Sequence, residues 1–161
     1  MKLYLINESP YMKQLLEKSC FIDNKKIEII STKGFLLDYS IQNNKLVIKH
    51  KNDSLINYLK SIKNSIIVIG TDLDSAGDFI AFELLEFLDK SNTILRLEIN
   101  FDELLKCKNS RELLQTVLKN SKDKINYTNA KRYWENFLLE NEKLDYINTI
   151  LTEMKNKTIK L

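Results

Sequence analysis

The stretch from Ser65 to Ile80 constrains the fold of this chain more than any other part of the sequence. It opens with Ile66–Ile69, an unbroken run of β-branched apolar residues that is too short for a buried helix. Such a run is typical of a strand buried on both faces, as in the centre of a parallel sheet. A glycine, two alternating aspartates and a helix-like pattern follow. We therefore expect a strand, loop and helix unit whose polar loop lies where open α/β sheets place their ligands.

Two carboxylates follow this strand at a spacing of two residues. In extended backbone, Asp72 and Asp74 project to the same side, and their like charges raise the pKa of one carboxyl unless a cation is shared. A hard, oxygen-seeking ion such as Mg²⁺ suits such a pair. The alternative is structural, because Asp74 and Ser75 can cap the helix, with Ser75 and Asp78 forming a capping box. The residues alone leave both roles open.

The composition indicates one well-buried domain with a short appendage, since the chain has 161 residues of which 43% are apolar. No apolar run approaches the roughly 18 residues of a membrane span, and the first residues do not resemble a signal peptide. We expect a soluble, cytoplasmic protein with no membrane partner. Cys20 and Cys107 lack metal-ligand spacing and are expected to be buried. The formal charge of +3 is weak evidence for nucleic acid.

Apolar patterns predict the remaining elements of a mainly parallel sheet covered by helices on both faces. Further strands are expected at residues 2–6, 26–30, 45–48 and 93–99, with 45–48 at an edge. Helices are expected from Pro10 to about Ser19, from about Asn52 to Ile62, and after Gly77. Leu36, Leu37 and Ile41 remain ambiguous.

Glu8 also follows an expected strand, directly before a helix start. Ser9 suits the cap position of that helix and Pro10 suits its first turn. Glu8 can therefore belong to a site at the carboxyl edge of the sheet, or it can complement the dipole of the helix.

From Phe101 onward we expect only helices, one beginning at Ser110 and a longer one near Thr128. The longer helix is expected to continue its apolar stripe through Leu144, Ile147, Ile150 and Leu151. Apolar stripes of this kind must be covered. We expect the two helices to pair as a hairpin on the sheet. In the alternative, the face with Tyr133, Trp134 and Phe137 meets a second copy of the chain or another protein partner.

Three separated motifs resemble Toprim domains, and above all the amino-terminal domain of type IA DNA topoisomerases. They are Asn7-Glu8-Ser9-Pro10, Thr32-Lys33-Gly34 followed by Asp38, and Thr71-Asp72-Leu73-Asp74 with Gly77-Asp78-Phe79-Ile80-Ala81. The resemblance covers residues 1–105 as a Toprim, Rossmann-like domain and leaves residues 106–161 as a helical extension. Weaker similarity continues at Asn129-Ala130-Lys131-Arg132, which resembles the start of the family's next, helical domain.

The resemblance implies roles for individual residues. Glu8 would be the general acid/base near a phosphate, acting with Asp72 and Asp74 as the catalytic set. The ligands of Mg²⁺, or of Mn²⁺ in its place, would be Glu8, Asp72, Asp74 and Asp78. The phosphate contacts would be Lys13, Lys33 and Ser75. In physical terms, a bound cation offsets phosphate charge while a carboxylate transfers a proton.

The chain also departs from the family pattern. Ser75 and Ala76 stand where the topoisomerases usually carry an arginine and a third acid, and Phe35 replaces a usual histidine. Met12 stands at a lysine position, with Lys13 one position off. No tyrosine of this sequence lies in a motif like that of the family's nucleophile, so we do not expect a complete topoisomerase.

Two functional interpretations follow. The first is a stand-alone Toprim protein that binds Mg²⁺ and nucleic-acid phosphates, with DNA favoured over RNA, as a nuclease-like phosphodiester enzyme or as a subunit of a DNA-processing complex. The second is a degenerate, non-catalytic binding module that keeps the fold and uses its helical extension for a partner.

Overall fold

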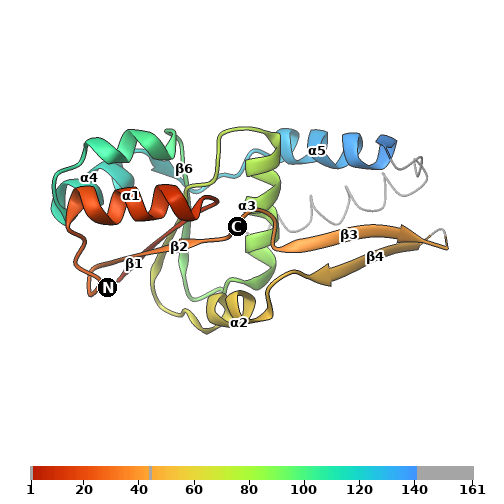
Figure 1. The fold of residues 1–161 in the computed structure, drawn as a ribbon, viewed down its shortest axis with the longest axis horizontal. Helices are drawn as coiled ribbons and strands as arrows, with labels where there is room; N and C mark the ends of the chain where they lie inside the picture. The colour runs from red at the N-terminus through yellow and green to blue at the C-terminus, as the bar shows by residue number, and fades with distance from the viewer. Residues whose placement is uncertain (1, 44, 141–161) are drawn as a thin grey trace.

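A five-stranded sheet forms the centre of the protein in a computed structural model that describes residues 2–43 and 45–140. Its strands, in spatial order, are β2 (Ile27–Ser31), β1 (Leu3–Asn7), β5 (Ile66–Ile69), β6 (Thr93–Leu97) and β7 (Ser121–Lys122). The first four are parallel, and β7 is antiparallel to β6. The fold class expected from the sequence is therefore confirmed: a mainly parallel sheet, flanked by helices, with a helix at the end of the described chain (Figure 1).

The β-branched run occupies the centre of the sheet, as the sequence predicts. Strand β5 lies between β1 and β6, with Val68 opposite Leu5 and Ile69 opposite Ile6. Ile67, Val68 and Ile69 are fully buried. A strand with covered faces on both sides has no need of alternating polar residues, which explains its unbroken apolar sequence.

Helices cover each face of this sheet. One face carries α1 (Pro10–Cys20), the 3₁₀ helix η1 (Phe101–Lys106) and α4 (Ser110–Lys119). The other carries α2 (Asp53–Ser61) and α3 (Ser75–Phe87). Ser9 caps α1 as expected, because its Oγ accepts the Met12 N–H at 3.2 Å and Pro10 takes the first turn. Within the described residues, no helix is both long and apolar enough to cross a membrane.

The segment at 45–48 does not join the main sheet, contrary to our expectation. It belongs to β4 (Lys45–His50), which pairs only with β3 (Leu37–Gln42) in a separate antiparallel hairpin. The hairpin extends away from the sheet beside α3 (Figure 1). The sequence left Leu36 and Leu37 ambiguous because their burial depends on a contact with a distant helix.

That contact is made by Glu83, a carboxylate on α3 that is 4% exposed. It accepts the backbone N–H of Leu36 at 2.8 Å and of Leu37 at 3.3 Å, and the hydroxyl of Tyr39 at 2.9 Å. Burial raises the pKa of Glu83 to about 7, against the opposing effect of these hydrogen bonds. Glu83 therefore fixes the start of the hairpin through a buried carboxyl group, and burial makes the ionised form of this group costly.

This arrangement predicts a pH-dependent stability. The pKa of Glu83 is about 7 in the folded protein against an ordinary value of 4.5, so the folded state binds a proton that the unfolded state has released. The free energy of unfolding should therefore fall as pH rises from 4.5 to 7. Urea unfolding of the wild type and of Glu83→Gln across this range measures the effect. We expect a shallower decline in the variant, and identical pH profiles would contradict this role of Glu83.

The end of the described chain differs from the predicted helical hairpin. Helix α5 (Tyr127–Glu140) packs on α3 and the β3–β4 hairpin, whereas α4 lies at the other side of the molecule (Figure 1). The turn between them contains β7, a strand that the polar sequence around Ser121 did not predict. The expected continuation at Leu144, Ile147, Ile150 and Leu151 lies outside the described residues.

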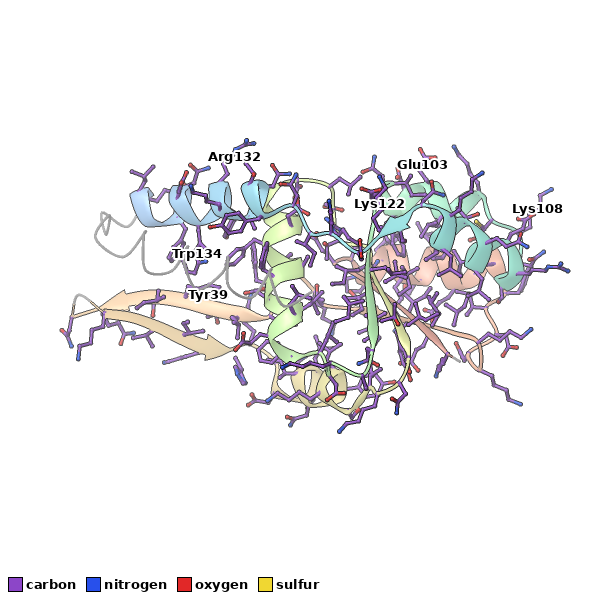
Figure 2. The ribbon with its side chains drawn as sticks, turned by 180° about the vertical axis from the view of Figure 1, so that it is seen from behind. Tyr39, Glu103, Lys108, Lys122, Arg132 and Trp134 are labelled. Atoms are coloured by element: carbon purple, nitrogen blue, oxygen red, sulfur yellow. The ribbon has the colours of Figure 1, made fainter. Side chains whose placement is uncertain are left out.

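The aromatic face of α5 is covered within the chain. Trp134 is 3% exposed and lies edge-on to Tyr39 and Phe79, at ring distances of 4.8 and 5.2 Å. Tyr133 stacks on Phe79 at 4.8 Å. Figure 2 shows Trp134 on the side of α5 that faces Tyr39, with Arg132 on the outer side. This face packs against the core, with Trp134 buried and Tyr133 and Phe137 partly buried, and a contact with a second copy or another protein stays a prediction.

Candidate functional site at the carboxyl edge of the sheet

The carboxyl ends of β1 and β5 bring Glu8 and Asp72 together. The Gly70 N–H donates to the Ile6 carbonyl at 2.6 Å, which extends the pairing of the two strands by one residue. Beyond it, the backbone N–H of Asp72 donates to Glu8 Oε1 at 2.7 Å. Because the strands are parallel neighbours, two residues that are far apart in the sequence meet at one edge. The edge is open, since Asp72 is exposed and Glu8 half-buried.

The electrostatics of this edge favour a proton or a cation. Burial is the main cause that raises the pKa of Glu8, and the charges of Asp72 and Asp74 raise it further, against the hydrogen bond from the Asp72 N–H. The pKa of Asp72 is also raised, by burial first and then by Asp74, with Arg96 opposing. The carboxylates therefore lie in a common negative field that a bound positive charge would relieve.

Asp74 has the capping role that the sequence left open. It is the N-cap of α3, and its Oδ1 accepts the Gly77 N–H at 2.6 Å. Gly77 is required here because a Cβ at this position would lie 1.8 Å from the Asp72 carbonyl oxygen. The proposed capping box of Ser75 and Asp78 does not form, since Asp74 and not Ser75 caps the helix. A metal role for Asp74 stays a prediction that has to coexist with this cap.

Asp78 lies beneath the edge, in a buried ion pair. Asp78 and Arg96 are 4% and 3% exposed. Both Nε and Nη2 of Arg96 lie 3.1 Å from Asp78 Oδ1, while the amide of Asn129 donates to Asp78 Oδ2 at 2.9 Å. Both carboxylate oxygens therefore have partners, and coordination of a cation by Asp78 would require the ion pair to break. A metal role for Asp78 stays a prediction that competes with this ion pair.

Arg96 is the residue that our sequence analysis missed. Besides Asp78, its guanidinium donates to the carbonyls of Ile69 at 3.1 Å, Thr71 at 2.7 Å and Asp72 at 2.8 Å. It thus holds the loop that presents Asp72. A signal was present in the sequence, because an arginine inside an apolar strand pattern is rarely buried without partners.

The three candidate phosphate contacts come from three different segments. Lys13 is half-buried on α1 and Ser75 begins α3, while Lys33 is exposed in a left-handed backbone conformation with φ 57°. The loop of Lys33 is tied to Glu8, since Ser31 Oγ donates to the Glu8 carbonyl at 3.1 Å. Asp38 lies on the hairpin, 3.9 Å from the Lys51 amine. Whether Lys13, Lys33 and Ser75 contact phosphate stays a prediction.

Two carboxyl groups at this edge are candidates for a magnesium ion. No group of three or more His, Cys, Asp or Glu side chains in the part of the chain that the structure describes is arranged to hold a metal. Mg²⁺, however, is commonly bound by one or two carboxylates, with waters and substrate phosphates completing its shell. Glu8 and Asp72, joined by the 2.7 Å hydrogen bond from the Asp72 N–H to Glu8 Oε1, supply two carboxyl groups at one edge, and their binding of Mg²⁺ stays a prediction.

Comparison with known proteins supports the fold. No protein family model matches the sequence, and no curated protein matches it. Among solved structures, the chain is similar to full-length topoisomerase I from Thermotoga maritima, with a TM-score of 0.53 and 15% sequence identity. The match covers 80% of this chain and 22% of the topoisomerase chain. The shared feature at this level of identity is the fold.

Proposed function

We propose that Glu8 and Asp72 form a site for Mg²⁺, or for Mn²⁺ in its place, together with the phosphates of a nucleic acid, DNA in preference to RNA. The observation that carries the proposal is the hydrogen bond of 2.7 Å that joins Glu8 to the Asp72 backbone at the open edge of the sheet. The Toprim-like motifs and the fold shared with a topoisomerase I are consistent with this assignment.

The chemistry of the site follows from its residues. A cation held by Glu8 and Asp72 would supply positive charge against the phosphate oxygens. Without the cation, Glu8, whose pKa is raised by burial, is suited to hold a proton near a phosphate ester oxygen and to release it, because one carboxyl does not carry a proton and a metal ion together. Lys33 and Lys13 would add charge around the phosphate, and Ser75 would add a hydroxyl at the start of α3. These residues together fit phosphodiester chemistry of a nuclease-like enzyme or of a subunit of a DNA-processing complex.

A second function is favoured by a specific observation. Asp78 is bound by Arg96 and Asn129, and Asp74 is bound to the Gly77 N–H, so the two further acids near the loop are already in use. Ser75 and Ala76 add no carboxylate. A site with so few free oxygens is also suited to a binding module that retains nucleic acid without cleaving it.

Fluorescence anisotropy with a labelled single-stranded DNA tests the proposal. We expect Mg²⁺ to tighten binding at least about tenfold relative to EDTA, which equals about 1.4 kcal/mol. Asp72→Asn should lose this dependence. Asp23→Asn is the matched control, because Asp23 is exposed before β2 at the opposite edge of the sheet.

Equal binding in Mg²⁺ and EDTA, or an Asp72→Asn variant that keeps the Mg²⁺ dependence, would contradict the site. Gel analysis of the same DNA then separates the two functions. Cleavage that is lost in Glu8→Gln identifies the enzyme, and Mg²⁺-dependent binding without cleavage identifies the binding module.

A further inference from the structure

A continuous chain of hydrogen bonds leads from helix α5 to the loop that carries Asp72. It begins at Asn129, half-buried in the first turn of α5, whose amide donates to Asp78 Oδ2 at 2.9 Å. The Asp78 carboxylate is paired with Arg96, and the guanidinium of Arg96 donates to the Asp72 carbonyl at 2.8 Å. The backbone N–H of Asp72 then donates to Glu8 Oε1 at 2.7 Å. Helix α5, which lies beside the start of α3 (Figure 1), is therefore linked to both carboxyl residues of the candidate metal site.

All the N–H groups of the Arg96 guanidinium are in use. An arginine side chain has five N–H donors. Nε and one N–H of Nη2 bind Asp78, and the remaining three bind the backbone carbonyls of the loop, those of Ile69, Thr71 and Asp72. A turn of the guanidinium would therefore break at least one bond to the loop. For this reason, the hold of Arg96 on the loop depends on the orientation of the Asp78 carboxylate.

The amide of Asn129 sets that orientation. An arginine and a carboxylate frequently pair as two forks, with one N–H on each carboxylate oxygen. Here Nε and Nη2 of Arg96 both lie 3.1 Å from the same oxygen, Asp78 Oδ1, while the second oxygen accepts the Asn129 amide. Without this amide, Asp78, which is 4% exposed, would be left with an unpaired oxygen, and this is costly. A turn of the carboxylate toward Arg96 would satisfy the oxygen and draw the guanidinium away from the loop.

We propose that Asn129 is a positioning residue for Asp72. It orients the Asp78 carboxylate, which orients Arg96, and the guanidinium then holds the loop where the Asp72 N–H meets Glu8. The docking of α5 is thereby a condition for the metal site, although the proposed ligands lie on other elements. The inference rests on the proposed function for the cation, whereas the positioning of Asp72 can be measured without metal.

Hydrogen exchange of backbone amides, followed by nuclear magnetic resonance without metal, tests the positioning. In Asn129→Leu, whose side chain has nearly the same size but no donor, the Asp72 amide should exchange at least about fivefold faster than in the wild type. Asn129→Ala, which adds no bulk, should show the same change. The amide of Val68, in the buried centre of the sheet, reports global unfolding and should change less. Asn136→Ala is the matched control, because it removes an amide from an exposed position of the same helix.

Titration with Mn²⁺ tests the consequence for the metal site. Loss of a group that directly supports a metal ligand commonly weakens metal binding about 10–100-fold, and Asn129 acts through two further side chains, so we expect Asn129→Ala to weaken Mn²⁺ binding at least about threefold. The variants should remain folded, because the buried Trp134 and its contact with Phe79 hold α5 on α3.

The outcomes separate this inference from the proposed function. Exchange of the Asp72 amide that stays unchanged, or that changes in Asn129→Leu alone, overturns the positioning role. Faster exchange in both variants with Mn²⁺ bound as tightly as in the wild type also overturns it. In each of these cases the proposed function stands if the wild type binds Mn²⁺ at Asp72. Faster exchange in both variants, together with a wild type that binds no Mn²⁺, supports the positioning role and contradicts the metal site.

Discussion

Replacing Arg96 by methionine is expected to lower the free energy of unfolding by about 3–5 kcal/mol. The change leaves the Asp78 carboxylate buried without its partner charge, and it removes the donors to the carbonyls of Ile69, Thr71 and Asp72. Methionine keeps an unbranched apolar stem in place of the guanidinium, so the loss is mainly one of charge and hydrogen bonds. Urea unfolding at pH 7, followed by circular dichroism, measures the effect.

Two variants control for this interpretation of Arg96. Arg132→Met removes the same group from an exposed position of α5 and should change stability by less than about 0.5 kcal/mol. Asp78→Asn added to Arg96→Met should recover part of the loss, because it removes the uncompensated charge. An Arg96→Met protein within about 1 kcal/mol of the wild type would contradict an essential ion pair at this position.

Replacing Trp134 by alanine is expected to cost about 3–5 kcal/mol, the usual range for a large buried aromatic residue. Trp134 joins three elements, because its ring contacts Tyr39 on the hairpin, Phe79 on α3 and Phe137 on its own helix. Its loss leaves a cavity between α5 and the rest of the chain. Chemical unfolding measures the cost, and limited proteolysis reports whether α5 detaches.

Leu139→Ala is the matched control for Trp134, because Leu139 lies on the same helix and is 54% exposed. It should leave both stability and proteolysis nearly unchanged. If instead Trp134→Ala unfolds like the wild type and only self-association is lost, the aromatic face of α5 serves as an interface and the packing described above is wrong.

The sequence predicted the parts of the fold and site that depend on local pattern. A central strand is buried on both faces and has no position for a polar residue. The unbroken β-branched run at Ile66–Ile69 therefore predicts a central strand directly. Glu8 and Asp72 were placed at one edge because parallel strands present their carboxyl ends together. Ser9 and Asp74 mark the starts of α1 and α3, because the side chain of a cap residue accepts a hydrogen bond from the first turn of its own helix.

What the sequence did not predict depends on contacts between distant segments. Glu83 binds the backbone of Leu36 and Leu37 where the hairpin begins, away from the main sheet. The sequence around residue 36 does not indicate this partner, because Glu83 lies on a distant helix. Periodicity shows that the α5 stripe is buried, but not that it is buried against α3 and the hairpin. In the same way, the sequence position of Asp78 near Asp74 suggested a metal ligand, but in the folded protein its carboxylate is paired with Arg96.

Titration with Mn²⁺, followed by nuclear magnetic resonance, tests for a divalent-metal site at Glu8 and Asp72, because this paramagnetic ion broadens the signals of nearby nuclei whether or not the protein has activity. We expect broadening of backbone amides around Glu8 and Asp72, reversed by excess Mg²⁺ and lost in the Asp72→Asn variant, with Asp23→Asn behaving like the wild type. Broadening centred elsewhere, or unchanged in Asp72→Asn, would contradict a divalent-metal site at this edge of the sheet.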